Sequence, residues 1–393
     1  MHSDFLKYQA QTSPHPLYLE VSHAKGSYVF DVKGKKYLDF VAGVSANSLG
    51  HNHPKVSEAI KNQVDLYTHV MVYGEFAQEA PVALCKLLAS TLPFKNGSVY
   101  LTNSGTEAAE GAIKLAKRST GRFEIIAAKN GYHGNTQGAM SVCGHEDKNQ
   151  AFRPLIPGVK FIQFNKFADL DKITNNTAAV ILETMQGGAG FIEPENGYLQ
   201  KVKEKCLEVG ALLILDEIQT GVGRTGNFWG FDTYKVIPDI IITGKGLGGG
   251  MPIGAFIAPL QLMSLLSNQP KLGHITTFGG HPVIAAAGLA TIQEILGGTL
   301  IEDTKTKEKL LRDCLKHPLI KEVRGKGLML AAMVESPEMA TKIILRCFDK
   351  GLLLFWLLFE GSAIRITPPL TISENELIEG CQILLETLDE LAS

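Results

Sequence analysis

Apolar residues in the middle of the chain gather in short continuous runs, and stretches with helical periodicity separate most of these runs. A continuous apolar run is typical of a strand that is buried on both faces, as in a parallel sheet. Such runs lie at 99–101, 125–128, 159–164, 179–182, 212–215, 240–242 and 253–258, with helical periods at 107–117 and 199–209 among the stretches between them. The pattern predicts an α/β fold with a mostly parallel sheet of about seven strands.

The two ends of the chain have different patterns. Residues 28–42 alternate apolar and polar side chains around Gly34, which indicates a hairpin. After Gly298 the order changes to helix, strand, helix, strand, strand, helix, and it closes with a strand at 363–367 and a helix at 374–391. This order predicts a smaller α+β domain.

These changes of pattern set the expected domain organisation. We expect residues 1–45 to be an N-terminal segment that contributes to the small domain, residues 46–297 to form the large domain, and residues 298–393 to form the C-terminal small domain. Pro54 is expected to open a helix as its first residue, and a helix at 283–296 is expected to lead out of the large domain.

Composition and charge narrow the class of protein. Hydrophobic residues make up 45% of the chain and charged residues 20%, which is typical of a compact folded protein. The net charge of −2 gives no electrostatic reason to bind nucleic acid or an anionic membrane. The N-terminus lacks an apolar signal segment, and no apolar run approaches the ~18 residues of a membrane span. The six cysteines are scattered without a C-x-x-C pair, so we expect reduced thiols in a cytoplasmic protein.

Two functional groups directly follow predicted strands. Asp216 ends the run at 212–215, and Lys245 lies just past the run at 240–242. The carboxyl ends of parallel strands are where open α/β sheets bind their ligands. A carboxylate and a lysine buried together in a glycine-rich hollow cost free energy unless a partner compensates them. We interpret the pair as the site of an aldehyde cofactor that lies between the two side chains.

Further candidate groups follow the neighbouring strands. Ser104, Gly105 and Thr106 join a strand to a helix, and the free N–H groups of a helix N-terminus bind anions such as phosphate. A capping box without any ligand explains these residues equally well. Tyr132 is a candidate to stack on a planar cofactor, with a simple packing role as the alternative. Glu183 ends a third strand and should reach the same edge of the sheet.

His51 and His53 have a spacing that can be mistaken for a pair of metal ligands. No cysteine or carboxylate lies at ligand spacing from them. We therefore expect a loop or packing role for both histidines, and no metal site.

Three motifs then carry a resemblance to a known family. They read D-E-I-Q-T-G-V-G-R-T-G from Asp216, T-G-K-G-L-G-G-G-M-P-I-G-A from Thr243, and H-I-T-T-F-G-G-H-P from His274. In this order they resemble the class III pyridoxal-phosphate-dependent aminotransferases, the group with acetylornithine, ornithine and 4-aminobutyrate aminotransferases. The resemblance extends from about Tyr28 through I-R-I-T-P-P-L at 364–370. It implies fold type I of these enzymes, pyridoxal 5′-phosphate as the cofactor, and a transaminase activity.

The resemblance also implies roles for the two strand-end groups. Lys245 is expected to form the Schiff base with the cofactor aldehyde and then to move the proton as general base and acid. Asp216 is expected to pair with the pyridine nitrogen and keep it protonated, so that the ring acts as an electron sink. Arg224 and Thr225, in G-R-T-G, are expected to be structural.

Four more residues match the family's cofactor-binding positions. Gln219 resembles the residue that donates to the ring hydroxyl oxygen, and Gly105 and Thr106 match the phosphate loop. Thr277 matches the threonine that reaches the phosphate of the neighbouring subunit. A site completed across an interface implies a two-fold symmetric homodimer with shared active sites.

The substrate side departs from the family pattern at two positions. Arg365 sits where the family keeps an arginine that binds a substrate carboxylate through a bidentate pair. Gly188 stands where many members carry a glutamate that shields this arginine, and Asn135 stands where acetylornithine and ornithine enzymes carry a second arginine. The site should therefore accept amines without an α-carboxylate. The apolar residues at 352–359 either line such a pocket or form a core strand.

These observations predict an aminotransferase that moves an ω-amino group to a 2-oxo acid. Acetylornithine or ornithine is the expected donor, and 2-oxoglutarate or pyruvate the expected acceptor. The alternatives are transamination of 4-aminobutyrate, a diamine or a β-amino acid, an aminomutase or decarboxylase on the same scaffold, and a non-catalytic cofactor-binding protein. Loss of Lys245 or Asp216 would favour the last of these, and both are present.

Overall fold

Seven strands from the middle of the chain form one sheet in the order β4-β10-β9-β8-β7-β5-β6 in a computed structural model that describes residues 2–392. The strands are β4 (Gly97–Thr102), β5 (Glu124–Ala128), β6 (Val159–Ile162), β7 (Thr177–Glu183), β8 (Leu212–Asp216), β9 (Ile240–Gly244) and β10 (Gly254–Pro259). The pairs from β6 to β9 are parallel, and β10 is antiparallel to both of its neighbours, β9 and β4. The predicted seven-stranded, mostly parallel sheet is therefore confirmed.

The antiparallel direction of β10 follows from its short connection to β9. Only the turn η4 (Lys245–Gly248) and a few glycine-rich residues separate the two strands. A parallel crossover needs about a dozen residues or more, so the chain has to turn straight back. This turn places Lys245 at the edge of the sheet.

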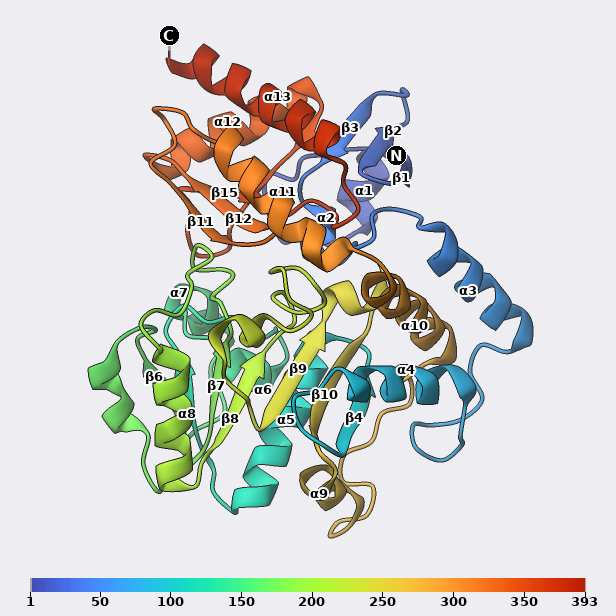
Figure 1. Cartoon of the computed structure of the whole chain (residues 1–393), viewed down its shortest axis with the longest axis vertical. Helices are drawn as coiled ribbons and strands as arrows, with labels where there is room; N and C mark the ends of the chain where they lie inside the picture. Colours follow the sequence, from blue (N-terminus) through green and yellow to red (C-terminus); the bar gives the residue numbers. More distant parts are fainter. Residues whose placement is uncertain (1, 393) are drawn as a thin grey trace.

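Helices cover both faces of the sheet (Figure 1). One face packs on α5 (Gly105–Thr120), whose alanine-rich side lies against β9 and β10. The other face packs with α8 (Tyr198–Val209), α4 (Glu79–Ser90) and α10 (Pro282–Gly297), and α3 (Pro54–Leu66) lies against α10. Pro54 is the first residue of α3, as predicted. The short helices in this part are α6 (Gln137–Ser141), α7 (Glu146–Asn149) and α9 (Leu260–Met263).

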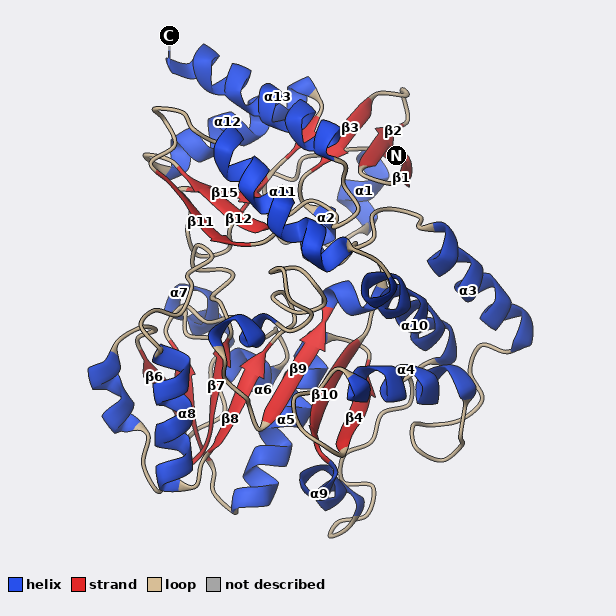
Figure 2. Cartoon of the chain, in the orientation of Figure 1, coloured by secondary structure: helices blue, strands red, loops and turns tan. Residues whose placement is uncertain are grey.

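The remaining strands form two smaller sheets above the carboxyl ends of the large one (Figure 2). The first has the order β1-β2-β3-β13 and the second the order β11-β12-β15-β14. Their strands are β1 (Val21–Lys25), β2 (Tyr28–Asp31), β3 (Lys36–Asp39), β11 (Glu322–Lys326), β12 (Met329–Met333), β13 (Leu352–Leu353), β14 (Phe355–Trp356) and β15 (Ala363–Ile366). The helices here are α1 (His2–Tyr8), α2 (Ala42–Ser45), α11 (Leu300–Cys314), α12 (Pro337–Lys350) and α13 (Glu374–Ala392).

The N-terminal hairpin joins this part through strand pairing. β2 and β3 pair antiparallel as predicted, and β13 adds to β3 in parallel, with Leu352 opposite Leu38. The exact domain boundaries remain predictions. Among residues 2–392 no single helix is long and apolar enough to cross a membrane; α10 and α11 meet that description only as a pair bent by 70°.

The predicted order after Gly298 was incomplete in two places. The structure has two strands, β11 and β12, where one was predicted, because the polar sequence of β11 has no apolar signal and Gly327, at φ +61°, turns the chain between them. The apolar stretch 352–359 divides into β13 and β14, which belong to different sheets. The stretch fits both interpretations, because Leu352 of β13 is buried in the core, whereas Phe355–Leu358 line the cavity described next.

Candidate active site

A cavity of about 640 Å³ lies at the carboxyl ends of the central strands. Its walls come from the loops after β5, β7, β8 and β9, from the start of α5, and from β14 and β15 of the small sheet. It brings together most of the residues selected from the sequence, which are Gly105, Thr106, Tyr132, Asn135, Glu183, Gly188, Asp216, Gln219, Lys245 and Arg365. Thr277 is the exception, because its side chain is exposed and does not line this cavity.

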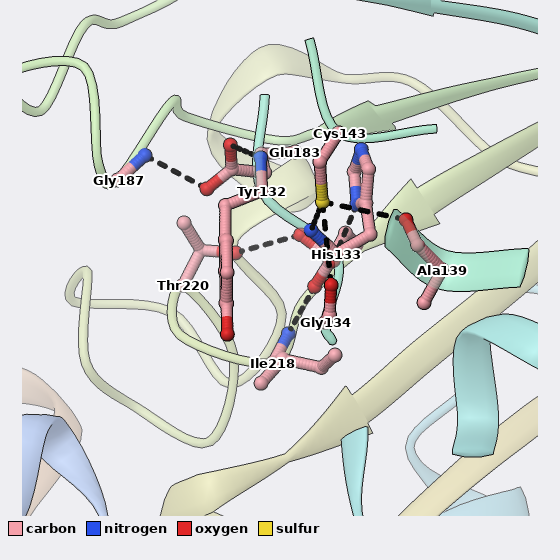
Figure 3. A network of polar contacts seen from close by, with 10 residues as sticks. Tyr132, His133, Gly134, Ala139, Cys143, Glu183, Gly187, Ile218 and Thr220 are labelled. Carbon is pink, nitrogen blue, oxygen red and sulfur yellow. Dashed lines mark hydrogen bonds and ion pairs between the residues drawn. The ribbon is translucent and has the colours of Figure 1, made fainter. Parts of the chain in front are cut away.

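Asp216 is held at the end of β8 by two hydrogen bonds. Its Oδ1 accepts from the backbone N–H of Ile218 at 2.9 Å, and its Oδ2 lies 2.8 Å from Nδ1 of the buried His133. The backbone N–H of His133 in turn donates to the Cys143 thiol, which donates to the carbonyl of Gly134 (Figure 3). The carboxylate is therefore fixed in place and needs no further partner from the protein.

His133 is a site residue that the sequence analysis missed. It directly follows Tyr132 in the loop after β5, and this place beside a selected residue is the only feature of the sequence that could have pointed to it. Its Nδ1 is within hydrogen-bond distance of Asp216, and its Nε2 is buried without a partner among the described residues. We infer that His133 orients the Asp216 carboxylate.

Lys245 enters the cavity from a tight glycine-rich turn. Its own φ is +41°, a conformation that is uncommon for a side chain other than glycine and that concentrates at functional sites. A Cβ atom on the next residue, Gly246, would lie 2.4 Å from Oγ of Ser48, so the turn has no room for a larger residue. The position of Lys245 is thus set by backbone geometry.

The burial of Lys245 favours its neutral amine. Burial lowers the pKa of Lys245 below its ordinary value, and the nearby Asp216 carboxylate opposes this change. The Arg365 guanidinium lowers the pKa further. A neutral amine is the form that attacks an aldehyde and accepts a proton.

The start of α5 offers free backbone N–H groups to the cavity. Ser104 caps the helix by accepting from the N–H of Glu107, and the cavity opens beside it. The Glu107 carboxylate accepts from the N–H of Asn103, so the return bond of the expected capping box reaches the residue before the cap. The Thr106 hydroxyl lies 2.9 Å from that of Thr136. A Cβ atom on Gly105 would lie 2.6 Å from Cδ1 of Ile218, so a larger residue there would displace the Ile218 side chain. Helix N-termini of this kind bind phosphate.

Glu183 joins two loops of the cavity wall. One carboxylate oxygen accepts from the N–H of Tyr132 at 3.0 Å and the other from the N–H of Gly187 at 2.8 Å (Figure 3). Burial raises the pKa of Glu183 to about 7, an effect that the neighbouring His133 opposes. Glu183 therefore fixes the loop that carries Tyr132 relative to the loop that carries Gly188.

Arg365 is a buried cation without a partner. Its Nε and Nη1 have no hydrogen bond, and it takes part in no ion pair among the described residues. Its guanidinium carbon lies 5.6 Å from the ring centre of Phe191, and burial lowers its pKa to about 10. Leaving such a group unpaired costs several kcal/mol. An anionic ligand would supply the missing partner.

The other selected residues are placed as follows. Gln219 donates weakly to Oγ of Ser45 at 3.3 Å, and Asn135 is exposed at the cavity rim. Arg224 is buried and donates to two backbone carbonyls of the C-terminal part, and Thr225 donates to the Thr220 carbonyl, which agrees with the expected structural roles.

His51 and His53, whose spacing can be mistaken for that of metal ligands, have structural roles. His51 is bonded to the Asp39 carboxylate at 2.7 Å and thereby ties its loop to the end of β3. His53 precedes α3 as its N-cap residue. Residues 2–392 contain no group of three or more side chains arranged to hold a metal ion.

Glu217 is a second residue whose importance was missed. It is fully buried beside Asp216 and accepts hydrogen bonds from the hydroxyls of Thr184 and Thr220 and from the N–H groups of Gly230 and Phe231. It anchors the loop after β8 and faces away from the cavity, whose lining does not include it.

Comparison with known proteins identifies the family. The family model for class III aminotransferases matches residues 8–388. The chain belongs to this family. It is 39% identical over 379 residues to an acetylornithine aminotransferase of Caldanaerobacter subterraneus subsp. tengcongensis, a match that covers 93% of this chain and 94% of that relative. It is 35% identical over 376 residues to the LysW-aminoadipate semialdehyde/glutamate semialdehyde transaminase of Sulfolobus acidocaldarius, covering 94% of this chain and 95% of the relative.

Solved structures show the same fold. The ornithine aminotransferase of Toxoplasma gondii ME49 has a TM-score of 0.92 at 30% identity, and the match covers 100% of this chain and 94% of that one. This confirms the predicted fold type I, with pyridoxal 5′-phosphate as the cofactor and transfer of an amino group to a 2-oxo acid as the reaction.

The cavity fits this cofactor. The start of α5, where Gly105 leaves the backbone N–H groups uncovered by a side chain, suits its phosphate. The fixed carboxylate of Asp216 and the amine of Lys245 line the same cavity, where a pyridine nitrogen and an aldehyde can each find a partner. The aromatic ring of Tyr132 lines it as well.

Proposed function

We propose that this aminotransferase takes an ω-amino group from acetylornithine, ornithine or a related amine and gives it to 2-oxoglutarate or pyruvate. The observation that carries the proposal is the unpartnered, buried guanidinium of Arg365 on the cavity wall. A planar guanidinium with two free nitrogen donors is suited to one substrate carboxylate. The names of the relatives support acetylornithine and ornithine as donors.

The chain's own residues divide the work of the reaction. When bound, pyridoxal 5′-phosphate supplies an aldehyde that exchanges amines and a ring that takes up electrons from the substrate carbon. The Lys245 amine would hold the aldehyde carbon and then carry the proton to and from the substrate carbon. Asp216, which His133 holds in place, would keep a proton on the ring nitrogen. Gly105 and Thr106 would bind the phosphate, Tyr132 would cover the ring, and Gln219 would donate to the ring oxygen.

Arg365→Ala tests the carboxylate site. We expect the KM for the 2-oxo acid to rise roughly 100-fold, because hydrogen bonds to charged groups contribute about 1.5–3 kcal/mol each. Arg365→Lys should recover part of this loss, since it keeps the charge without the fork. Steady-state assays over a panel of amines against 2-oxoglutarate and pyruvate provide the measurement, and omission of the acceptor distinguishes an aminomutase, which needs none.

The matched control is Arg346→Ala, because Arg346 is an exposed arginine of α12 that pairs with Glu390. Its KM values should equal those of the wild type. An unchanged KM for the 2-oxo acid in Arg365→Ala would contradict the proposal.

We also propose a homodimer in which Thr277 reaches the phosphate of the second subunit. Thr277 is exposed, and the ring of the next residue, Phe278, lies 4.8 Å from that of His69, with the two planes tilted by 50°. This contact joins two segments that expose large apolar side chains, among them Val64, Leu66, Val70, Met71, Phe76, Leu272, Ile275 and Phe278. An apolar surface of this kind favours a protein interface. Sedimentation should give twice the 42.6 kDa chain mass, and a monomer at assay concentration would contradict this.

We propose a cytoplasmic location as well. The support is the state of the cysteines, since all six are free thiols in the structure and four of them are buried. Free buried thiols are typical of reducing compartments.

A further inference from the structure

We propose that Arg224 is a positioning residue for substrate binding: it fixes the strand that carries Arg365 relative to the loop that follows Asp216. These two parts of the site belong to different sheets, because Arg365 lies on β15 of a small sheet and Asp216 ends β8 of the large one (Figure 2). Arg224 thereby sets the distance between the carboxylate site and the cofactor. The inference rests on the proposed function, in which Arg365 binds a substrate carboxylate.

The Arg224 guanidinium joins the neighbouring ends of two strands in the small sheet. Its Nη1 donates to the carbonyl of Leu328, directly before β12, at 3.0 Å, and also to the carbonyl of Pro368, shortly after β15. β12 and β15 pair antiparallel, with Ala331 opposite Arg365, so the start of β12 lies beside the end of β15. One nitrogen therefore holds both strands. A displacement of this end of the strand pair requires that these bonds break.

The backbone of the loop that carries Arg224 also contacts the small sheet. The N–H of Leu328 donates to the Arg224 carbonyl at 2.9 Å. A Cβ atom on Gly327, in the turn between β11 and β12, would lie 2.5 Å from the same carbonyl oxygen, so this turn packs directly on the loop. Thr220, earlier in the loop, lines the cavity, and its carbonyl accepts from the Thr225 hydroxyl at 3.0 Å. The loop thus connects the cavity wall to the small sheet.

Arg224 is a buried cation without a counter-ion. Only 1% of its surface is exposed, and burial lowers its pKa to about 9, so it carries its charge at neutral pH. Its Nε and Nη2 have no hydrogen-bond partner among residues 2–392, and no carboxylate there forms an ion pair with it. An apolar side chain of similar size would avoid the cost of burying this charge. Such a side chain could not bridge two carbonyls, and the bridge is what arginine adds at this position.

The segment after β15 has further anchors that do not involve Arg224. The N–H of Thr367 donates to the Phe40 carbonyl at 2.7 Å, and the N–H of Leu370 donates to the Ser48 carbonyl at 2.8 Å. These bonds should hold the segment near its place when the guanidinium is removed. We therefore expect a displaced carboxylate site and a folded enzyme.

Arg224→Met removes the bridge and keeps most of the side-chain volume. The KM for the 2-oxo acid should rise about tenfold, since a small displacement of a binding group weakens the contact that it makes. The kcat at saturating acceptor and the dissociation constant of the cofactor should stay near the wild-type values, because the groups on the large sheet keep their places. A general structural role would instead lower the melting temperature or weaken cofactor binding, without a selective change in this KM.

The decisive measurement repeats Arg224→Met in the Arg365→Ala enzyme. If Arg224 acts through Arg365, the double variant should have the same KM for the 2-oxo acid as Arg365→Ala, because the residue that Arg224 positions has already lost its guanidinium. Two independent contributions would instead multiply their effects on KM.

Arg122→Met is the matched control. Arg122 also bridges backbone carbonyls, among them those of Thr177 and Val209, but it does so at the end of the large sheet opposite the cavity. This variant should keep the wild-type KM. Should Arg224→Met fail to fold, Arg224→Lys serves instead. It keeps the charge and can reach one carbonyl, so its KM should lie between those of the wild type and Arg365→Ala.

Two outcomes would overturn the inference alone. One is a wild-type KM in the folded Arg224 variant, while Arg365→Ala shows the expected rise. The other is a further rise of the same size when the Arg224 change is added to Arg365→Ala, because Arg224 would then act elsewhere. A wild-type KM in Arg365→Ala itself would refute the proposed function, and this inference with it. The single Arg365→Ala enzyme therefore distinguishes the two failures.

Discussion

Lys245→Ala should lower kcat by roughly 10⁴-fold, the upper end of what one positioned acid–base group contributes. The variant should still fold, because the side chain projects into the cavity and carries none of the backbone hydrogen bonds of β9. The measurement is the rate of amino transfer with a donor that the wild type uses. Added ethylamine should restore part of the rate, since a small free amine can carry protons in the empty space.

Lys201→Ala is the matched control for this change. Lys201 lies on the exposed side of α8 and pairs only with Glu204 among the contacts described. Its replacement should leave kcat unchanged. A Lys245→Ala enzyme with more than about one-tenth of wild-type kcat would show that another group moves the proton.

Asp216→Asn should lower kcat by roughly 10³-fold, because an amide has the shape of the carboxylate but cannot hold a proton on the ring nitrogen. The amide oxygen can still accept from the Ile218 N–H, so the loop should keep its structure. Loss of the charge should also alter the absorbance of the bound cofactor. Stopped-flow absorbance of each half-reaction measures both effects.

His133→Gln tests the position of the Asp216 carboxylate separately from its charge, because it changes the residue that orients the carboxylate. It keeps a donor near Asp216, so the loss should be smaller than in Asp216→Asn. A kcat for Asp216→Asn within about tenfold of the wild-type value would mean that the Asp216 carboxylate does not control the proton on the ring nitrogen of the cofactor.

The sequence alone predicted the large sheet well for a physical reason. Strands buried on both faces, such as β7 and β8, are continuously apolar, and helical periods separate them along this part of the chain. Their ends also locate Glu183, Asp216 and Lys245, because parallel strands finish at a common edge. The positions of these groups followed from local pattern and general topology.

The small sheets were harder to predict because their strands are short. β13 and β14 have two residues each, and the uniformly apolar stretch 352–359 hides the break between them. β11 is largely polar and half-exposed, so periodicity does not distinguish it from a loop. Arg365 was placed by family resemblance, since nothing local shows that β15 meets the ends of β7 to β9.

The polar supports of the site were missed for another reason. His133 and Glu217 act through partners that are distant in sequence, Asp216 for the former and Gly230 and Phe231 for the latter. Hydrogen bonds of this type depend on tertiary structure, and neither residue lies in a pattern of its own.

The central claim is that the cofactor is bound covalently by Lys245, and reductive trapping tests it most directly. Borohydride fixes a lysine-bound carbonyl compound as a stable secondary amine, so peptide mass spectrometry can locate the modified residue. We expect the added mass of the reduced cofactor on the peptide that contains Lys245, and no such mass in Lys245→Ala. Trapping at a different lysine, or no trapping in the wild-type enzyme, would contradict the account.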